Sequence, residues 1–113
     1  MNVNSDFDLN SILNSPGIGK YSVEFSAGDF ICLEGKDSRD LFILTEGVLE
    51  VFKGQQKLAE ISEIGALVGE ISFLLQQERT ATVKAKSFVK AICIPQDKIQ
   101  LFLKEFPSLA WHI

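Results

Sequence analysis

The stretch GEISFLLQQERTATVKA, residues 69–85, joins two local patterns that differ in period. Residues 71–77, ISFLLQQ, form the one segment in the middle of the chain that we predict to be helical, and residues 79–85, RTATVKA, alternate like a strand. About two turns of helix followed by a reversal would bring the chain back on itself. We therefore expect Glu70 and Arg79 to lie close together.

A short helix that begins beside Gly69 is suited to an anion. The first N–H groups of a helix lack internal partners and carry partial positive charge, and glycine lets a ligand approach the main chain. Arg79 would offer its planar guanidinium to a phosphate, whereas Glu70 would repel it and suits a hydroxyl group such as that of a ribose. A Glu70–Arg79 ion pair that only tethers the turn explains the same residues, and this alternative stays open.

The rest of the chain consists of short apolar runs separated by glycines. The predicted strands are residues 21–25, 30–34, 41–47, 48–53, 58–62, 79–85 and 88–94. Seven or eight short strands at this spacing predict a mainly β fold. A sandwich, a jelly roll or a barrel fits the pattern, and alternating β and α units do not.

Helical patterns flank this series of strands. The first helix is predicted after Ser5, and the sequence SPG at residues 15–17 ends it. The second is predicted over about residues 96–106, with one apolar face made of Ile99, Phe102, Leu103 and Phe106. Residues 108–113 look like the start of another helix.

Length and composition describe an ordinary globular domain. The 113 residues, 46% hydrophobic and 23% charged, predict a single domain over 1–113. A net charge of -4 argues against direct nucleic-acid binding, because such proteins rely on Lys and Arg. No apolar run reaches the roughly 18 residues of a membrane span, and the N-terminus lacks the features of a secretory signal. We therefore expect a cytoplasmic domain without a membrane segment.

The nucleophilic and metal-ligating residues are few. Cys32 and Cys93 lie in apolar, strand-like runs, which predicts buried thiols, with a neighbouring pair as the alternative. The one histidine, His112, stands next to the last residue, so neither a metal site nor a catalytic triad can be assembled around it. We expect a protein that is not an enzyme and needs no cofactor, although Glu70 and Arg79 alone would be able to assist phosphodiester chemistry.

Two stretches resemble the cyclic nucleotide-binding domain family. They are AGDFICLEGKDSRDLFILTEGVLEV at residues 27–51 and the stretch at residues 69–85, and the resemblance covers about residues 20–106. The second stretch is similar to the family's phosphate-binding cassette, G-E-[LI]-[AS]-L-L followed by R-[ATS]-A-[TS]-V. The resemblance implies a β-roll, a jelly-roll-like double-stranded β-helix of about eight strands over residues 20–95. An N-terminal helix, a short cassette helix and a C-terminal helix over 96–106 would accompany it.

The same resemblance implies cAMP or cGMP as the ligand. Glu70 would accept a hydrogen bond from the ribose 2′-hydroxyl group, and Arg79 would bind the exocyclic oxygens of the phosphate. The backbone N–H groups of Ile71, Ser72 and Ala81 would lie alongside.

For the base, the resemblance implies apolar contacts. Ile71, with Val51 and Ala59, would supply them, although plain core packing is the alternative for Val51 and Ala59. Thr80 would assist the phosphate or a guanine amino group, and it does not decide between the two nucleotides. Val68 departs from the family's pattern, which often has an aromatic residue there.

The implied function is a regulatory sensor whose C-terminal helices respond to the ligand and pass the response to an unknown effector. The family's long lid helix is absent or begins only at residues 108–113, so the sequence is expected to be a fragment that ends before it. The alternative is an interaction or dimerisation module without a ligand, docking through Phe106, Leu109 and Trp111. A homodimer stays open.

Overall fold

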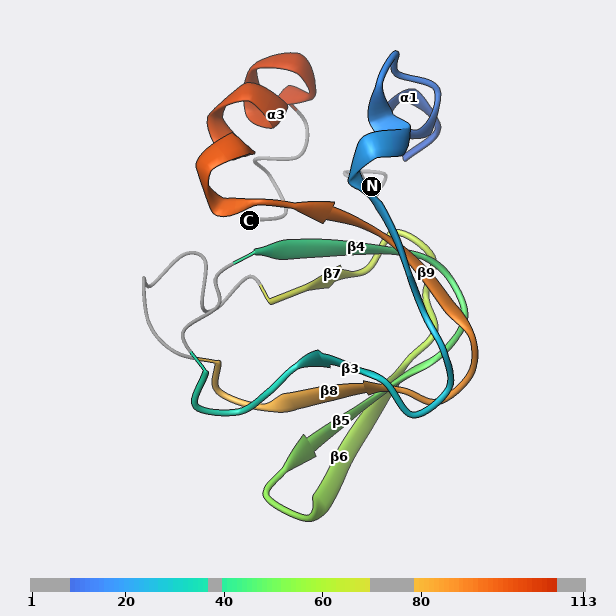
Figure 1. Ribbon diagram of the computed structural model, residues 1–113, viewed down its shortest axis with the longest axis vertical. Helices are drawn as coiled ribbons and strands as arrows, with labels where there is room; N and C mark the ends of the chain where they lie inside the picture. The colour runs from blue at the N-terminus through green and yellow to red at the C-terminus, as the bar shows by residue number, and fades with distance from the viewer. Residues whose placement is uncertain (1–8, 37–39, 70–78, 108–113) are drawn as a thin grey trace, which may run out of the picture.

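The computed structural model describes residues 9–36, 40–69 and 79–107, and it has two four-stranded antiparallel sheets (Figure 1). The first sheet has the order β2 (Ser22–Phe25), β9 (Val89–Ile94), β4 (Leu41–Glu46), β7 (Leu67–Val68). The second has the order β3 (Phe30–Cys32), β8 (Thr82–Ala85), β5 (Leu49–Lys53), β6 (Gln56–Ile61). Most neighbouring strands are far apart in the sequence. The expected β-roll of about eight strands is confirmed.

Two apolar cores lie on opposite faces of the first sheet. Strand β4 is buried on both faces, and its side chains alternate between the cores because successive strand residues point to opposite sides. The core between the sheets contains Cys32, Phe42, Leu44, Leu49, Val68, Val83, Ala85, Val89 and Ala91. The core between the first sheet and the helices contains Ile12, Leu41, Ile43, Ile92, Ile94, Ile99 and Phe102.

Short helices cover the outer face of the first sheet, where α1 and α3 lie on the same side of β4 and β9 (Figure 1). The helical elements are α1 (Leu9–Leu13), the 3₁₀ helices η1 (Ile18–Tyr21) and η2 (Gln96–Lys98), and α3 (Ile99–Glu105). The predicted apolar face of the last helix is confirmed, since Ile99 and Phe102 are buried and Leu103 and Phe106 pack against the same core. No helix in the described ranges is long and apolar enough to cross a membrane.

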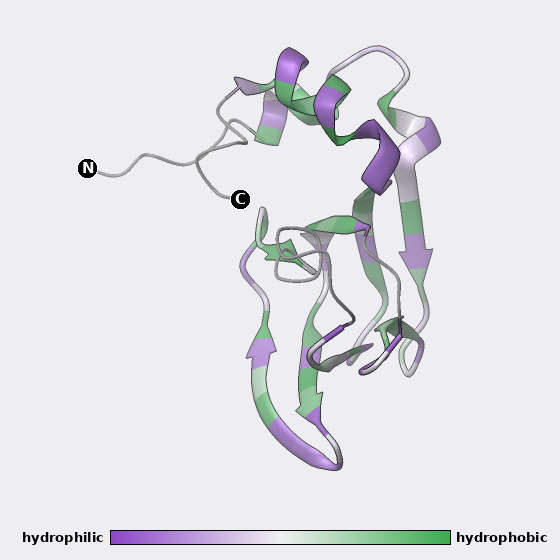
Figure 2. Ribbon diagram, turned by 90° about the vertical axis from the view of Figure 1, so that its left-hand side faces the viewer, coloured by the Kyte–Doolittle hydropathy of each residue, from purple (hydrophilic) through white to green (hydrophobic). Residues whose placement is uncertain are grey.

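The hairpin of β5 and β6 extends away from the rest of the roll (Figure 2). Strand β6 is an exposed edge in which Glu60 stands directly opposite Glu50. Facing carboxylates destabilise a sheet, and two lysines offset this repulsion. Lys57 pairs with Glu50 at 2.9 Å and also with Glu60, and Lys86 pairs with Glu60 at 2.6 Å.

Several predicted boundaries are wrong. Arg79 does not lie inside a strand: β8 begins at Thr82, and Arg79 and Thr80 precede it. Strand β6 begins at Gln56, because the hairpin turn is shorter than expected, and β7 was not predicted because two residues show no periodicity. The predicted helix at 71–77 and the start of the first helix lie outside the described residues.

Candidate functional site

Arg79 is 3% exposed and is the one buried charged side chain in the part of the chain that the structure describes. Its main chain is held against the segment that follows β3. The Arg79 N–H donates to the Lys36 carbonyl at 2.9 Å, and the Arg79 carbonyl accepts from the Gly35 N–H at 2.9 Å. Two backbone bonds thus set where the side chain enters the roll.

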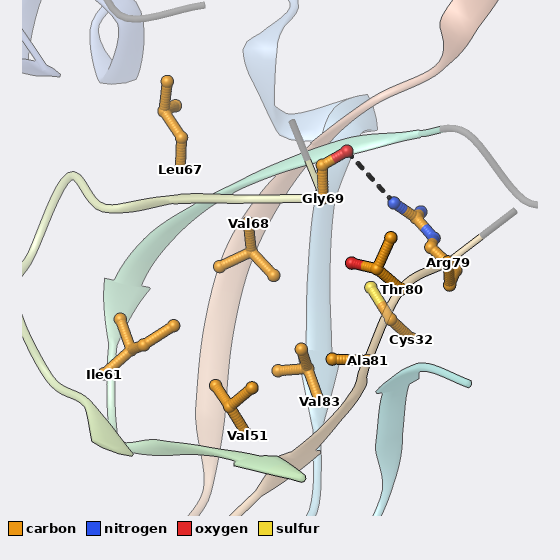
Figure 3. A pocket seen from close by; sticks show the side chains of 10 residues that line it. All are labelled: Cys32, Val51, Ile61, Leu67, Val68, Gly69, Arg79, Thr80, Ala81 and Val83. Carbon is orange, nitrogen blue, oxygen red and sulfur yellow. Dashed lines mark hydrogen bonds between the residues drawn. The ribbon is translucent and has the colours of Figure 1, made fainter. Parts of the chain in front are cut away.

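The guanidinium of Arg79 donates to two main-chain carbonyls that flank different strands. Nη1 donates to the Gly69 oxygen, at the end of β7, at 3.2 Å, and Nη2 donates to the Asp40 oxygen, before β4, at 2.8 Å (Figure 3 draws the first bond). A buried cation needs polar partners, and carbonyl oxygens supply partial negative charge. Arg79 therefore connects three segments of the roll at one point.

Gly69 is required at this point for two reasons. Its φ of +91° is a conformation that other residues rarely adopt. A Cβ atom on Gly69 would also collide with Arg79 Nη1 and lie 2.9 Å from the Asp40 oxygen. The backbone conformation and the close approach of the guanidinium both explain a glycine at this position, while the approach of a ligand to its main chain stays a prediction.

An open pocket lies between the two sheets next to Arg79 (Figure 3). Its volume of about 170 Å³ is on the scale of cavities that admit an aromatic ring. Apolar side chains form most of the wall, with Arg79 and Thr80 at one end and Val51 and Ile61 at the other (Figure 3). The lining residues are Cys32, Val51, Ile61, Leu67, Val68, Gly69, Arg79, Thr80, Ala81 and Val83.

The predicted site residues separate into three groups. Gly69, Arg79, Thr80, Ala81 and Val51 come together at this pocket. Val51 also packs against the core between the sheets. Ala59, proposed for the base, is exposed on β6 and is not among the lining residues, so neither the pocket nor the core explains it. The predicted residues Glu70, Ile71 and Ser72 lie outside the described residues.

A charged pair holds the main chain at the mouth of the pocket. The Lys53 ammonium donates to the Thr80 carbonyl at 2.8 Å and pairs with Glu34 at 3.1 Å. The Gly54 N–H and the Lys53 ammonium hold the pKa of the Glu34 carboxyl below its usual value. Sequence reasoning did not single out Lys53 or Glu34, because they come from segments far from Thr80 in the chain.

Asp40 is a further residue that sequence reasoning missed. Besides its carbonyl, which accepts from Arg79, its carboxylate accepts the Gln96 N–H at Oδ1 over 3.2 Å. Oδ2 lies 3.8 Å from the Cys93 sulfur, and burial together with the Asp40 charge raises the pKa of the Cys93 thiol to about 11. Within the described residues neither Cys32 nor Cys93 forms a disulfide; Cys32 is buried, as expected, whereas Cys93 is only half-buried. No local pattern distinguishes Asp40 from other loop aspartates.

Comparisons with known proteins show which family the chain resembles. The model of the cyclic nucleotide-binding domain family matches residues 22–106. The chain is 32% identical over 84 residues to cGMP-dependent protein kinase 2 of Mus musculus, covering 74% of this chain and 11% of that protein. It is 29% identical over 85 residues to potassium/sodium hyperpolarization-activated cyclic nucleotide-gated channel 2 of Mus musculus, covering 75% and 10%. The chain thus spans about a tenth of the length of these relatives.

Solved structures show the same fold. The CBD2 domain of PKAR with bound Sp-2Cl-cAMPS superposes with a TM-score of 0.68 at 21% identity, covering 86% of this chain and 70% of that one. The regulatory subunit of a cAMP-independent protein kinase A from Trypanosoma brucei gives a TM-score of 0.67 at 26% identity, covering 79% and 34%. The family model covers well over half of the chain, and the fold agrees with it. The chain therefore belongs to the cyclic nucleotide-binding domain family.

Proposed function

We propose that this domain binds cAMP or cGMP in the pocket between the two sheets and acts as a regulatory sensor. The observation that carries the proposal is the buried Arg79 guanidinium at the polar end of an otherwise apolar pocket. A cyclic nucleotide has the same division, with a phosphate monoanion at one end and an aromatic base at the other. Family membership supports the assignment.

The phosphate is assigned to Arg79. A guanidinium carries five N–H donors in a planar fork, so it can hold main-chain carbonyls and an anion together. The N–H groups of Ile71, Ser72 and Ala81 are assigned to the same phosphate, and Glu70 to the ribose 2′-hydroxyl group.

The base is assigned to the apolar end of the pocket. Val51 lines this end from β5, and Ile71 is assigned to the same contact. Thr80 lies at the polar end, where its hydroxyl can assist the phosphate or a guanine. Ala59 is withdrawn from the proposed site, because it is exposed on β6 outside the pocket.

The output is assigned to the C-terminal elements η2 and α3. A ligand shifts an equilibrium between two positions of these helices only by its differential affinity for them. An attached effector would read that shift, and the domain itself would bind without turning over its ligand. Release of 5′-AMP from excess cAMP by the purified protein would contradict this assignment. A ligand of this kind also fits the cytoplasmic location expected from the sequence.

A side-by-side calorimetric titration with cAMP and cGMP tests the proposal. Binding of either nucleotide with one site per chain is the expected result. Thermal melts give an independent readout, because a ligand at 100 times its dissociation constant stabilises the folded state by about 2.7 kcal/mol. If neither nucleotide produces heat or raises the melting temperature, the proposed function is wrong.

A second candidate is an interaction or dimerisation module that uses this fold without a nucleotide. Two observations favour this candidate. Arg79 already has a structural role through its bonds to Gly69 and Asp40. One structural neighbour is the regulatory subunit of a cAMP-independent protein kinase A. Sedimentation analysis separates the two functions. A dimer that forms without nucleotide, together with flat titrations, would favour this candidate.

A further inference from the structure

Asp40 contacts both the proposed nucleotide site and the start of the C-terminal helices. Its carbonyl oxygen accepts from Arg79 Nη2 at 2.8 Å, and its carboxylate Oδ1 accepts from the Gln96 N–H at 3.2 Å. Gln96 is the first residue of η2, which continues directly into α3. Arg79 is 39 positions away from Asp40 and Gln96 is 56 positions away, so the tertiary fold alone brings these groups together.

The Asp40 carboxylate contacts β9 and the segment after it, just beyond the last residue pair of β4 and β9. The last pair at this end is Leu41 with Ile94, and Asp40 stands one residue before it. Its Oδ2 lies 3.8 Å from the sulfur of Cys93 on β9. Both carboxylate oxygens therefore point toward the segment of β9 and η2, while the carbonyl of the same residue points toward the guanidinium.

The hydrogen bond from the Gln96 N–H to the Asp40 carboxylate lies at the start of a helix, where such a bond helps to fix the position of the helix. The first N–H groups of a helix have no partner within it, and a carboxylate there is also favoured by the helix dipole. A bond between a half-buried carboxylate and a backbone N–H is charge-assisted and stronger than a neutral one. Asp40 thus holds the first turn of the C-terminal helices.

We propose that Asp40 is a positioning residue that couples the occupancy of the anion site at Arg79 to the position of η2 and α3. This inference rests on the proposed function. A phosphate that shares the guanidinium changes the bond from Nη2 to the Asp40 carbonyl. Since that carbonyl and the carboxylate belong to one residue, movement of the first alters the bond of the second to Gln96.

Four substitutions isolate the two ends of the Asp40–Gln96 bond. Asp40→Ala removes the acceptor, whereas Asp40→Asn keeps an acceptor oxygen and removes the charge. Gln96→Pro removes the donor N–H, and proline is well tolerated because Gln96 is the first helical residue and Pro95 before it is extended, with ψ 147°. Gln96→Ala changes the same side chain and keeps the N–H.

A fifth variant is the matched control. Asp29 also accepts a backbone N–H with its carboxylate, from Ser26 at 2.8 Å, in the turn between β2 and β3. Asp29→Ala therefore removes the same kind of bond at a place without contact to Arg79 or η2. Far-UV circular dichroism checks that each variant is folded. If Asp40→Ala does not fold, the pair Gln96→Pro and Gln96→Ala decides the question.

Hydrogen exchange over residues 95–105, measured by mass spectrometry with and without saturating nucleotide, is the readout. In the parent protein, the nucleotide should change the exchange rate there by about fivefold or more, the scale of a typical coupling between sites. Asp40→Ala and Gln96→Pro should lose most of that change at saturation. Asp40→Asn, Gln96→Ala and Asp29→Ala should keep it.

The outcomes separate this inference from the function on which it rests. A parent that binds neither cAMP nor cGMP contradicts the proposed function and the coupling together. A parent that binds while Asp40→Ala or Gln96→Pro keeps the full response contradicts the coupling alone. The coupling is also overturned if Gln96→Ala loses as much as Gln96→Pro, because the bond itself would then not be the cause.

Discussion

Gly69 and Arg79 are in direct contact, with Arg79 Nη1 donating to the Gly69 carbonyl at 3.2 Å and no space between them for a side chain. Because the carbonyl of Asp40 accepts from the same guanidinium, this contact joins the end of β7 to the start of β4. A residue predicted to bind phosphate is therefore also part of the framework of the roll. Tests of binding at this site have to separate the two roles.

Gly69→Ala should lower the free energy of unfolding for two reasons: the unfavourable backbone conformation and the collision with Arg79. The same substitution at a second glycine separates the two contributions. Gly28 has a similar φ of +95°, and a Cβ atom there would meet nothing within 4 Å. Gly28→Ala should cost about 1 kcal/mol for the backbone conformation alone. Gly69→Ala should cost at least about 1 kcal/mol more, because it also displaces the guanidinium. Urea denaturation measures both, and equal losses would mean that the collision is relieved without cost.

Arg79→Ala should weaken nucleotide binding by about 2–5 kcal/mol, which is roughly one and a half to three and a half decades in the dissociation constant. Arg79→Lys should restore little of it, since an ammonium cannot form the planar fork. Lys84→Ala is the control for loss of one positive charge. Lys84 lies on β8 and its Nζ is 5.9 Å from the centre of the Phe30 ring. Calorimetry that finds Arg79→Ala equal to Lys84→Ala would remove Arg79 from the site.

Val51→Ala should weaken binding by about threefold to tenfold, because the base loses contact with apolar surface worth about 0.8 kcal/mol per methylene group. Ala59 is paired with Val51 across the β5–β6 hairpin but is exposed. Ala59→Ser should therefore leave the dissociation constant unchanged. Parallel titrations with the preferred nucleotide compare the two variants. A larger effect at Ala59 than at Val51 would contradict the placement of the base.

Glu60 should make stability depend on pH in acid. Hydrogen bonds from Lys57 and Lys86 lower the pKa of its carboxyl from 4.5 to about 2. A folded-state pKa below the unfolded one means that its contribution is fully present above about pH 4.5 and is lost as the pH falls toward 2.

The measurement for Glu60 compares urea midpoints of the parent and of Glu60→Gln from pH 5 down to pH 2. The difference between the two should be largest at pH 5 and should shrink toward pH 2. It should also be smaller in 1 M salt, because these charges are exposed to solvent. A difference that does not vary over this pH range would show that the ion pairs do not stabilise the hairpin.

The pattern of apolar residues predicted secondary structure well where the conformation of a residue depends on its neighbours in the chain. The alternation of apolar residues located seven of the strands, and the spacing of Ile99 and Phe102 located α3. Strand β7, with two residues, is too short for a period to be visible. The strand predicted from Arg79 was too long, because the backbone bonds of Arg79 go to Gly35 and Lys36, outside the sheet, and β8 begins only at Thr82.

The sequence by itself determined the class of fold, and it singled out Gly69 and predicted Arg79 as the residue that binds an anion. These depend on short-range chemistry: side-chain period, the conformational freedom of glycine, and a guanidinium nine positions after Glu70. Only the tertiary structure decided that Val51 reaches the pocket while Ala59 does not, and that Asp40 contacts both Arg79 and Gln96. Such contacts join residues far apart in the chain, and their partners are set by how the two sheets stack and how the last helix returns.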